Sequence, residues 1–280
     1  MIKICICQLI KDEQRYIQEW IDFYISLGIC KFILFEDYNS SSHNEVLSKY
    51  GDKVILYKLL DVLNDKEKQR FIRSYLRQDP VWKCFYRLHK DEFDACLFID
   101  VDEFLLCDKD EFINEVQNHI DDPLVKAISY TWLTITASGH IRDPYPNQKY
   151  SLKNTYKEIL DRPIKDLNEN GKLLIYLKKL DSENDFLVPH TLRNQEYHHI
   201  STIRLRHYLT KSWDEFKWRI YNRGELFNNS FSRKKELFFD INQDLAYKKD
   251  ELLEECKDLN PKYNTNEELI KYLNNKCDQY

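Results

Sequence analysis

The residues best suited to a chemical role are two aspartates, Asp100 and Asp102, which follow an apolar segment that ends at Ile99. In an extended chain, side chains two positions apart point to the same face, so both carboxylates can approach one cation. Mg²⁺ and Mn²⁺ prefer such oxygen ligands and are typically held by one or two carboxylates together with substrate phosphates. A cation there would stabilise the charge that develops on a departing diphosphate. The run Asp100 to Glu103 could instead form a solvated turn or a helix cap.

Apolar segments alternate with amphipathic ones up to this acidic turn, and they indicate the elements that hold it. Strands are expected over residues 2–10, 31–35, 54–59 and 95–99, with helices between them. The first helix has apolar side chains at helical spacing, a possible cap at Asp12 and a stop at Gly28. Strands separated by helices predict an α/β domain with a mostly parallel sheet and right-handed crossovers.

Ligands of parallel sheets collect at the carboxyl ends of the strands, and further candidate residues fall there. Asp37 follows the second expected strand. Its carboxylate could accept hydrogen bonds from a ribose hydroxyl or a base N–H, or it could form an Asx turn that leads to the next helix. Lys11 follows the first strand and could meet a nucleotide, or it could be an ordinary exposed lysine.

A second group of candidates lies around His207. In an extended chain this histidine shares a face with apolar residues, so it is either a core histidine or a ligand that faces the sheet. Lys211 and Ser212 stand at the start of a predicted helix, where N–H groups and a cation can hold phosphate. Ser212 and Glu215 also form a capping-box pattern, so Ser212 could act only as a cap.

Composition excludes several classes of protein. A net charge of -5 lacks the basic excess of nucleic-acid-binding domains, so no nucleic-acid partner is expected. Only 5 glycines are present, which argues against a glycine-rich phosphate loop. The 8 cysteines include no C-x-x-C pair and indicate reduced, buried thiols in a cytoplasmic protein. No apolar stretch approaches the roughly 20 residues that span a bilayer, although basic or aromatic tail residues could allow peripheral membrane contact.

Four segments occur in an order and spacing typical of one group of enzymes. They are Lys11-Asp12-Glu13 with Glu19-Trp20-Ile21, residues 32–40, residues 98–105 around Asp100-Val101-Asp102-Glu103, and His207-Tyr208 with Lys211-Ser212, Glu215-Phe216 and Arg223-Gly224. Together they resemble the GT-A glycosyltransferases related to glycosyltransferase family 2, and more closely the family 92 type domain. The third segment is a close match to the metal motif of these enzymes, whereas the second is a variant.

The resemblance implies a GT-A fold, which is a Rossmann-like α/β domain with a mostly parallel central sheet and flanking helices. It also implies a nucleotide-sugar donor and a divalent ion, Mn²⁺ or Mg²⁺. By this resemblance Asp100 and Asp102 bind the metal and the diphosphate, and His207 is a third metal ligand or a diphosphate contact. Asp37 is then a nucleotide contact and Lys211 a diphosphate contact.

Related domains largely act with inversion at the anomeric carbon, which requires a carboxylate base to deprotonate the acceptor hydroxyl. Asp143, Glu183 and Asp185 are candidates on acceptor-side segments, and each could equally be a surface acid. The expected catalytic domain comprises residues 1–224, with a nucleotide-sugar half at about 1–108 and an acceptor-side half at about 109–224. A helical C-terminal extension is expected at 225–280.

The leading hypothesis is a metal-dependent hexosyltransferase that uses a UDP- or GDP-sugar and a saccharide or glycoconjugate acceptor. Its products would belong to surface polysaccharide, lipopolysaccharide or glycoprotein assembly. A metal-dependent nucleotidyltransferase is an alternative, but the segment after the first strand lacks the glycine-rich, basic loop that such enzymes normally need. A non-catalytic glycan-binding or scaffold protein is a third possibility, from another class.

Overall fold

The chain folds into two compact units. The computed structural model describes residues 2–37, 40–68, 78–161, 171–182, 186–188, 191–192, 198–222 and 231–257. The first unit comprises Met1–Leu133 and Lys165–His207, and the second comprises Thr134–Ile164 and Tyr208–Tyr280. The acidic turn and the four strands expected from the sequence all belong to the first unit.

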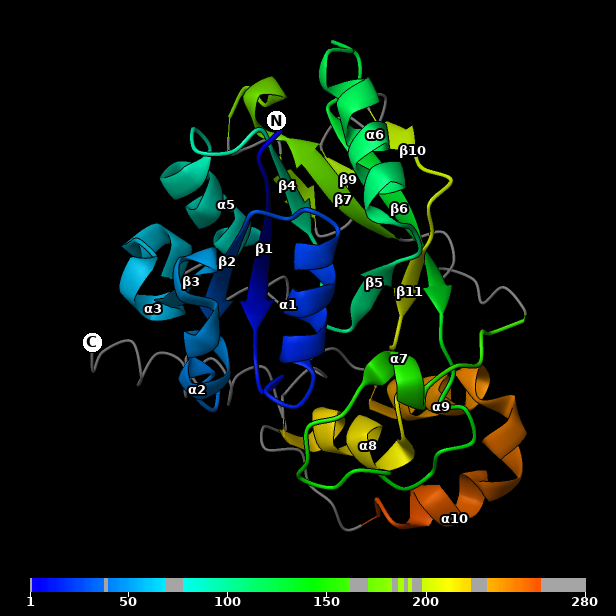
Figure 1. Ribbon diagram of the computed structural model, residues 1–280. Coiled ribbons are helices and arrows are strands. Elements are labelled where there is room, and N and C mark those ends of the chain that lie inside the picture. The colour runs from blue at the N-terminus through cyan, green and yellow to red at the C-terminus, as the bar shows by residue number, and fades with distance from the viewer. Residues whose placement is uncertain are drawn as a thin grey trace. The chain divides into compact units, whose positions relative to one another are not determined.

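Four parallel strands form one half of the sheet in the first unit, in the spatial order β3-β2-β1-β4 (Figure 1). They are β1 (Ile4–Ile10), β2 (Lys31–Glu36), β3 (Val54–Lys58) and β4 (Ala95–Phe98). Their connections contain α1 (Ile17–Ser26), α2 (Asn44–Leu47), a 3₁₀ helix (Ser48–Lys53), α3 (Leu59–Val62) and α5 (Gln78–His89). The apolar runs of these strands are typical of strands covered on both faces. This half confirms the predicted α/β class.

The other half of the sheet is mixed, so the sheet as a whole is less parallel than the sequence predicts. Strand β7 (Gly171–Tyr176) is antiparallel to both β4 and β6 (Ala127–Thr134), and β5 (Glu103–Leu105) is antiparallel to β11 (Leu205–His207). Strand β10 (His198–Ile200) runs parallel to β6, and α6 (Lys109–Ile120) lies between β5 and β6 in sequence. Strands β8 (Phe186–Val188) and β9 (Thr191–Leu192) pair as a separate ribbon.

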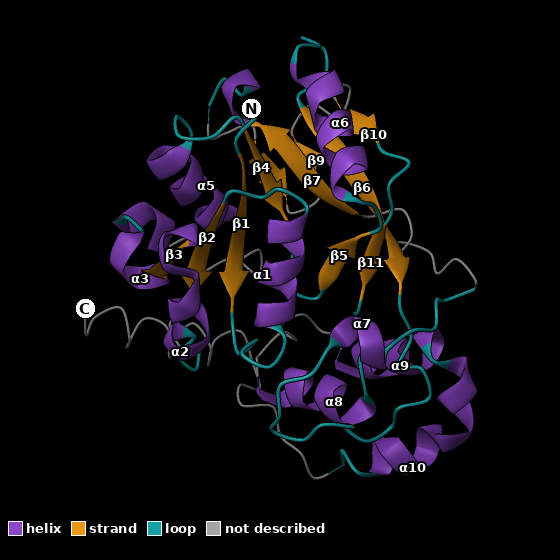
Figure 2. Cartoon of the chain, viewed as in Figure 1, coloured by secondary structure: helices purple, strands orange, loops and turns teal. Residues whose placement is uncertain are grey.

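Helices cover both faces of the parallel half (Figure 2). Helix α1 packs Trp20 on Phe32 of β2, with ring centroids 5.6 Å apart. Helix α5 packs Trp82 on Phe98 of β4, with ring centroids 4.9 Å apart. Ile33, the neighbour of Phe32 in β2, lies in the same buried cluster as Trp82 and Phe98. Because neighbouring strand residues point to opposite faces, the two helices enclose the sheet and bury its strands.

Several local expectations need correction. Asp12 does not cap α1, which begins at Ile17 without a side-chain cap; the Asp12 carboxylate accepts a hydrogen bond from the Ser41 N–H instead (2.8 Å). Strand β7 ends at Tyr176 and is followed by a 3₁₀ turn, and β11 is only three residues long. Seven cysteines of the described part are free thiols, of which Cys30 is exposed.

Gly171 occupies a position that has no room for a side chain. It lies opposite Thr131 in the β6–β7 ladder, and a Cβ at this position would overlap the carbonyl oxygen of Tyr130. We expect Gly171→Ala to force the two strands apart and to lower the free energy of unfolding by about 3 kcal/mol, which urea denaturation measures. Gly51→Ala is the control, because no atom lies within 4 Å of a Cβ at this position and only the positive φ of 53° opposes a side chain. We expect this variant to lower the free energy of unfolding by about 1–2 kcal/mol. Equal midpoints for both variants would contradict the steric explanation.

The second unit is held by aromatic packing between helices. Trp213 of α8 (Trp213–Asn222) contacts Phe238 and Phe239 of α9 (Phe231–Ile241), with ring centroids 5.0 and 5.3 Å apart. The unit also contains α7 (Leu152–Thr155), a 3₁₀ helix (Gln243–Lys248) and α10 (Lys249–Glu254). Helices α8 and α9 thus share one core, and the domain boundary expected after residue 224 stays a prediction. No helix in the described ranges combines the length and the apolarity needed to cross a bilayer.

Candidate active site at the strand ends

Asp100 lies directly beyond β4 and is held by side chains from three other segments. Its Oδ2 is 2.6 Å from Nζ of Lys172, which β7 places beside β4. Its Oδ1 accepts hydrogen bonds from Gln8 of β1 (2.7 Å) and from Gln78 of α5 (3.0 Å). Burial tends to raise the pKa of Asp100, but the ammonium of Lys172 outweighs it and holds that pKa below its usual value. Asp100 is therefore a fixed, charged carboxylate.

The chain turns directly after Asp100, which corrects the extended geometry expected for the two aspartates. The N–H of Glu103 donates to the carbonyl oxygen of Asp100 (3.1 Å), so Val101 and Asp102 form a turn. Asp102 consequently lies near His207, with 3.9 Å between Oδ1 and Nε2. The aspartates thus have different neighbours, Lys172 for the first and His207 for the second.

Glu103 lies beneath the turn and is fully buried. Its Oε2 accepts the N–H of Asp100 (2.9 Å) and lies 3.9 Å from Nζ of Lys172. Its Oε1 has no hydrogen-bond partner among the described residues, and it lies 3.9 Å from Nε2 of His207. Burial raises the pKa of Glu103 well above its usual value. A polar atom buried without a partner is costly, so a ligand that contacts this oxygen would be stabilised.

His207 faces the acidic turn because β11 pairs with β5 in a register that sets His207 opposite Glu103. The imidazole packs on Trp132 of β6, with ring centroids 4.6 Å apart. Nζ of Lys172 lies 5.9 Å from the centroid of the same indole. Trp132 thus contacts both the histidine and the lysine that flank the two aspartates, and it restricts where each can point.

The residues around Asp102 fit a divalent cation. An ion about 2.1 Å from each of two ligand atoms can bridge atoms up to about 4.2 Å apart. Asp102 Oδ1 and His207 Nε2 are 3.9 Å apart. Oε1 of Glu103, which has no hydrogen-bond partner among the described residues, is a third oxygen or nitrogen atom close to this position. Carboxylate and imidazole together suit Mn²⁺ better than thiolate-seeking metals.

The chain by itself offers an incomplete set of ligands. In the described ranges, no three His, Cys, Asp or Glu side chains converge as a ready metal site. Mg²⁺ and Mn²⁺ usually retain waters and take substrate phosphates as ligands, so an open set with few protein donors is suitable for an ion that arrives with a nucleotide. The expected triad of Asp100, Asp102 and His207 stays a prediction, and Asp100 would have to exchange Lys172 for the ion.

The two predicted nucleotide contacts, Lys11 and Asp37, lie together at the ends of neighbouring strands. Strands β1 and β2 pair in register up to Ile10 and Glu36, which brings the next residues side by side. Nζ of Lys11 is 3.9 Å from Oδ2 of Asp37, and both side chains are buried. The backbone N–H of Asp37 donates to the carbonyl oxygen of Ile10 (3.0 Å), which continues the pairing.

Two of the remaining candidates, Lys211 and Asp143, belong to the second unit. Lys211 is buried and has an unusual positive φ of 54°. Strained backbone of this kind is common at functional sites. Asp143 is also in the second unit and accepts the N–H of Tyr145 (2.9 Å) in a local turn. Glu183 and Asp185 lie outside the described residues.

The capping role predicted for Ser212 is confirmed in part. Its Oγ accepts the N–H of Glu215 (3.2 Å) at the start of α8. The return bond of a capping box is replaced, since the N–H of Ser212 donates to the Tyr156 hydroxyl (3.1 Å). The Glu215 carboxylate accepts from the Tyr150 hydroxyl instead (2.6 Å). Two tyrosines thus complete the end of the helix.

Sequence reasoning did not identify Lys172 or Gln8 as partners of Asp100. The signal available for Lys172 was a single cation in the otherwise apolar run of β7, which is the pattern of a buried lysine that needs a carboxylate. Gln8 gave a weaker signal of the same kind, as the only amide in β1. Neither pattern names the partner, because the contacts join residues 72 and 92 positions apart.

Comparison with solved structures gives distant likenesses. HddC from Yersinia pseudotuberculosis has 11% identity and a TM-score of 0.35, with 73% of this chain and 92% of that chain covered. Glucosyl-3-phosphoglycerate synthase from Mycobacterium tuberculosis, solved with Mn²⁺, UDP-glucose and phosphoglyceric acid, has 13% identity and a TM-score of 0.32, with 47% and 44% covered. A mycobacterial protein has 15% identity and a TM-score of 0.31, with 48% and 42% covered. The chain thus spans less than half the length of the last two.

Comparison with protein families is more direct. No curated protein matches the chain. A family model, described as glycosyltransferase family 92, matches residues 1–245, which includes all four segments that carry the resemblance. The match confirms that resemblance over most of the 280 residues. The chain belongs to glycosyltransferase family 92.

Proposed function

We propose that this glycosyltransferase moves a hexose from a UDP- or GDP-sugar to a hydroxyl group of a saccharide or glycoconjugate acceptor, with help from Mn²⁺ or Mg²⁺. The observation that carries the proposal is the separation of 3.9 Å between Asp102 Oδ1 and His207 Nε2, beside the unpartnered Oε1 of buried Glu103. The acidic turn that holds Asp102 and Glu103 follows the end of parallel strand β4, and ligands of such sheets usually bind at the strand ends.

Each residue near the strand ends has a distinct role in this proposal. Asp102 and His207 would hold the metal ion, which supplies positive charge to the diphosphate that leaves the sugar. Asp100 is kept in place by Lys172, so that a fixed carboxylate adjoins the metal position without reorganisation during the reaction. Lys11 and Asp37 would bind the nucleoside part of the donor, where a cation and an anion side by side can each meet a complementary group.

The acceptor side of the reaction depends on residues whose roles stay predictions. Inversion at the anomeric carbon would require a base for the acceptor hydroxyl, and Asp143, Glu183 and Asp185 remain the candidates. Lys211 would contact the diphosphate, and its strained backbone supports a functional role for this buried residue. Assembly of surface polysaccharide, lipopolysaccharide or glycoprotein would supply an acceptor of the required kind.

The proposal is tested with a panel of UDP- and GDP-hexoses. We expect calorimetry to detect binding of at least one donor in the presence of Mn²⁺ and a loss of at least tenfold in affinity after EDTA treatment. Product analysis with a saccharide acceptor should then show a new glycosidic bond and a free nucleoside diphosphate. Absence of donor binding to the wild-type protein at millimolar concentration would overturn the proposal, and release of pyrophosphate would indicate nucleotidyl transfer instead.

A further inference from the structure

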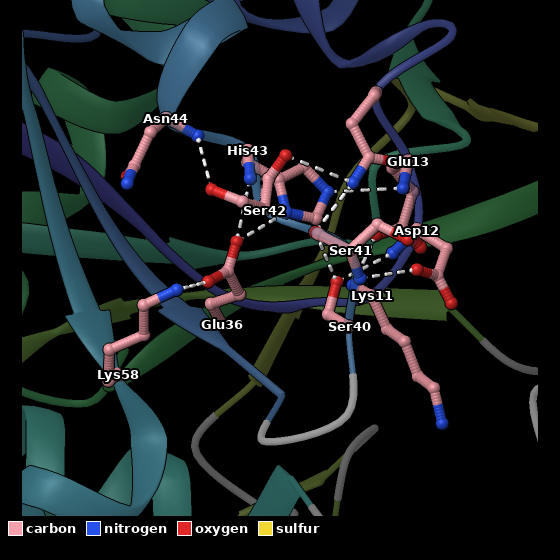
Figure 3. Close-up of polar contacts among 11 residues, drawn as sticks. Lys11, Asp12, Glu13, Glu36, Ser40, Ser41, Ser42, His43, Asn44 and Lys58 are labelled. Atoms are coloured by element: carbon pink, nitrogen blue, oxygen red, sulfur yellow. Dashed lines mark hydrogen bonds and ion pairs between the residues drawn. The ribbon is translucent and has the colours of Figure 1, made fainter.

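A buried histidine, His43, connects the segment that follows β2 to the segment that follows β1 (Figure 3). Its imidazole is fully buried. Nε2 accepts a hydrogen bond from the backbone N–H of Glu13 (3.1 Å), and Nδ1 lies 2.8 Å from Oε1 of Glu36. Because Nε2 acts as an acceptor, the ring proton must be on Nδ1, which donates to the Glu36 carboxylate. The tautomer is thus determined by two different partners.

Glu36 anchors this arrangement at the end of β2. Its Oε1 also accepts the backbone N–H of His43 (2.8 Å), and its Oε2 is paired with the ammonium of Lys58 on β3. Burial tends to raise the pKa of Glu36, but hydrogen bonds from Lys58 and His43 outweigh it and the pKa lies below its usual value. Glu36 is therefore a buried anion that orients the imidazole from below.

A second set of bonds joins the same two segments, as the sticks in Figure 3 show. The N–H of Asp12 donates to Oγ of Ser40 (3.0 Å), and the N–H of Ser41 donates to Oδ1 of Asp12 (2.8 Å). Asp12 has a positive φ of 57°, a conformation that these reciprocal bonds hold in place. We refer to Asp12, Glu13, Ser40 and His43 as the loop clamp.

The loop clamp is joined to both predicted nucleotide contacts through the backbone. Lys11 directly precedes Asp12, and the N–H of Ser40 donates to the carbonyl oxygen of Asp37 (3.0 Å). The backbone of both contact residues is therefore restrained from the side of the clamp as well as from the strands. Restraint before binding removes an ordering cost that the ligand would otherwise have to offset.

We propose that His43 is a positioning residue that, through its bond to the Glu13 N–H, keeps Lys11 and Asp37 in one arrangement before the nucleoside diphosphate arrives. This inference rests on the proposed function, because it assigns that ligand class to the Lys11–Asp37 pair. His43 itself touches neither the sugar nor the metal in this role. Its loss should weaken donor binding and raise KM, while kcat at saturating donor stays within about twofold of the wild type.

Two substitutions separate the two bonds of the imidazole. The amide of His43→Gln can place its oxygen near the Nε2 position and accept from the Glu13 N–H, whereas the shorter amide of His43→Asn reaches only the Nδ1 position and Glu36. We expect His43→Asn to weaken binding of UDP or GDP with Mn²⁺ by about tenfold in calorimetry, and His43→Gln to restore most of the affinity. Ser40→Ala, which removes the acceptor of the Asp12 N–H, should weaken binding severalfold with His43 intact.

A matched control is available in the same unit. His89 is also buried, and its Nε2 and Nδ1 lie 3.0 Å from the Tyr57 hydroxyl and from a Glu92 oxygen, respectively. His89→Asn removes the Nε2 contact of a buried histidine outside the clamp. It should lower the melting temperature to a similar extent as His43→Asn but leave nucleotide affinity unchanged.

The possible results separate the clamp from the proposed function. Equal affinity of wild type and His43→Asn would overturn the clamp, as would equal losses in His43→Asn and His43→Gln. If the wild type binds no nucleotide, the proposed function fails, and hydrogen exchange then decides whether the clamp exists. The Glu13 amide should lose protection in His43→Asn and keep it in His43→Gln. Should His43→Asn not fold, wild-type affinity in Ser40→Ala would equally overturn the inference.

Discussion

Asp102→Asn is expected to lower kcat/KM for sugar transfer by about 100- to 1,000-fold, which is typical of the loss of one group that stabilises charge in the transition state. The amide keeps the size of the side chain but removes the negative charge that faces His207 across 3.9 Å. Weaker metal binding follows, since amide oxygen is a poorer ligand than carboxylate. Steady-state kinetics with varied Mn²⁺ measures both effects, and the apparent Mn²⁺ constant should rise with the loss in rate.

The control for this prediction is Asp108→Asn. Asp108 lies six positions further on, where its Oδ1 accepts the N–H of Glu111 (2.9 Å) as the cap of α6. Asparagine caps helices as well as aspartate does, so stability and activity should both be near those of the wild type. Full activity of Asp102→Asn with unchanged dependence on Mn²⁺ would rule out a metal-binding role for Asp102.

Lys172→Met is expected to lower the free energy of unfolding by about 2–3 kcal/mol. Removing one partner of a buried ion pair typically costs about 3–5 kcal/mol, because the other charge stays buried without compensation. Here the lysine side chain is 3% exposed but that of Asp100 is 28% exposed, so solvent recovers part of the loss. Asp100 then lacks its cation, and added Mn²⁺ should stabilise the variant more than the wild type.

Chemical denaturation and a thermal-shift series with Mn²⁺ measure this prediction. Lys178→Met is the matched control, because Lys178 forms an ion pair with Asp94 at 2.8 Å but its side chain is 70% exposed. Such an exposed pair contributes little to stability, and no effect of Mn²⁺ is expected there. If the Lys172 and Lys178 variants are equally stable, the buried pair contributes nothing beyond a surface pair, and the fixed orientation proposed for Asp100 loses its support.

Local pattern in the sequence was sufficient for the parallel half of the sheet and for the residues at its strand ends. The strand expected over 95–99 is β4, and Asp100 follows it as predicted. Lys11 and Asp37 meet because the ends of neighbouring parallel strands lie at one edge. Strands that are buried on both faces need apolar runs, and helices need apolar residues at helical spacing. Both patterns extend over only a few residues, so short stretches of sequence are enough to predict this part of the fold.

Only the tertiary structure decided which partners the acidic residues have. The turn at Val101 and Asp102 separates the two aspartates, and antiparallel β7 brings Lys172 to Asp100 across 72 positions of sequence. His43 likewise gains its role from a backbone N–H 30 positions earlier. The physical reason is that a buried charge or ring nitrogen needs a hydrogen-bond or ion-pair partner, whereas the local periodicity of the sequence shows only that the residue is buried. Which partner it finds depends on strand order and register, and these emerge only when the whole sheet is assembled.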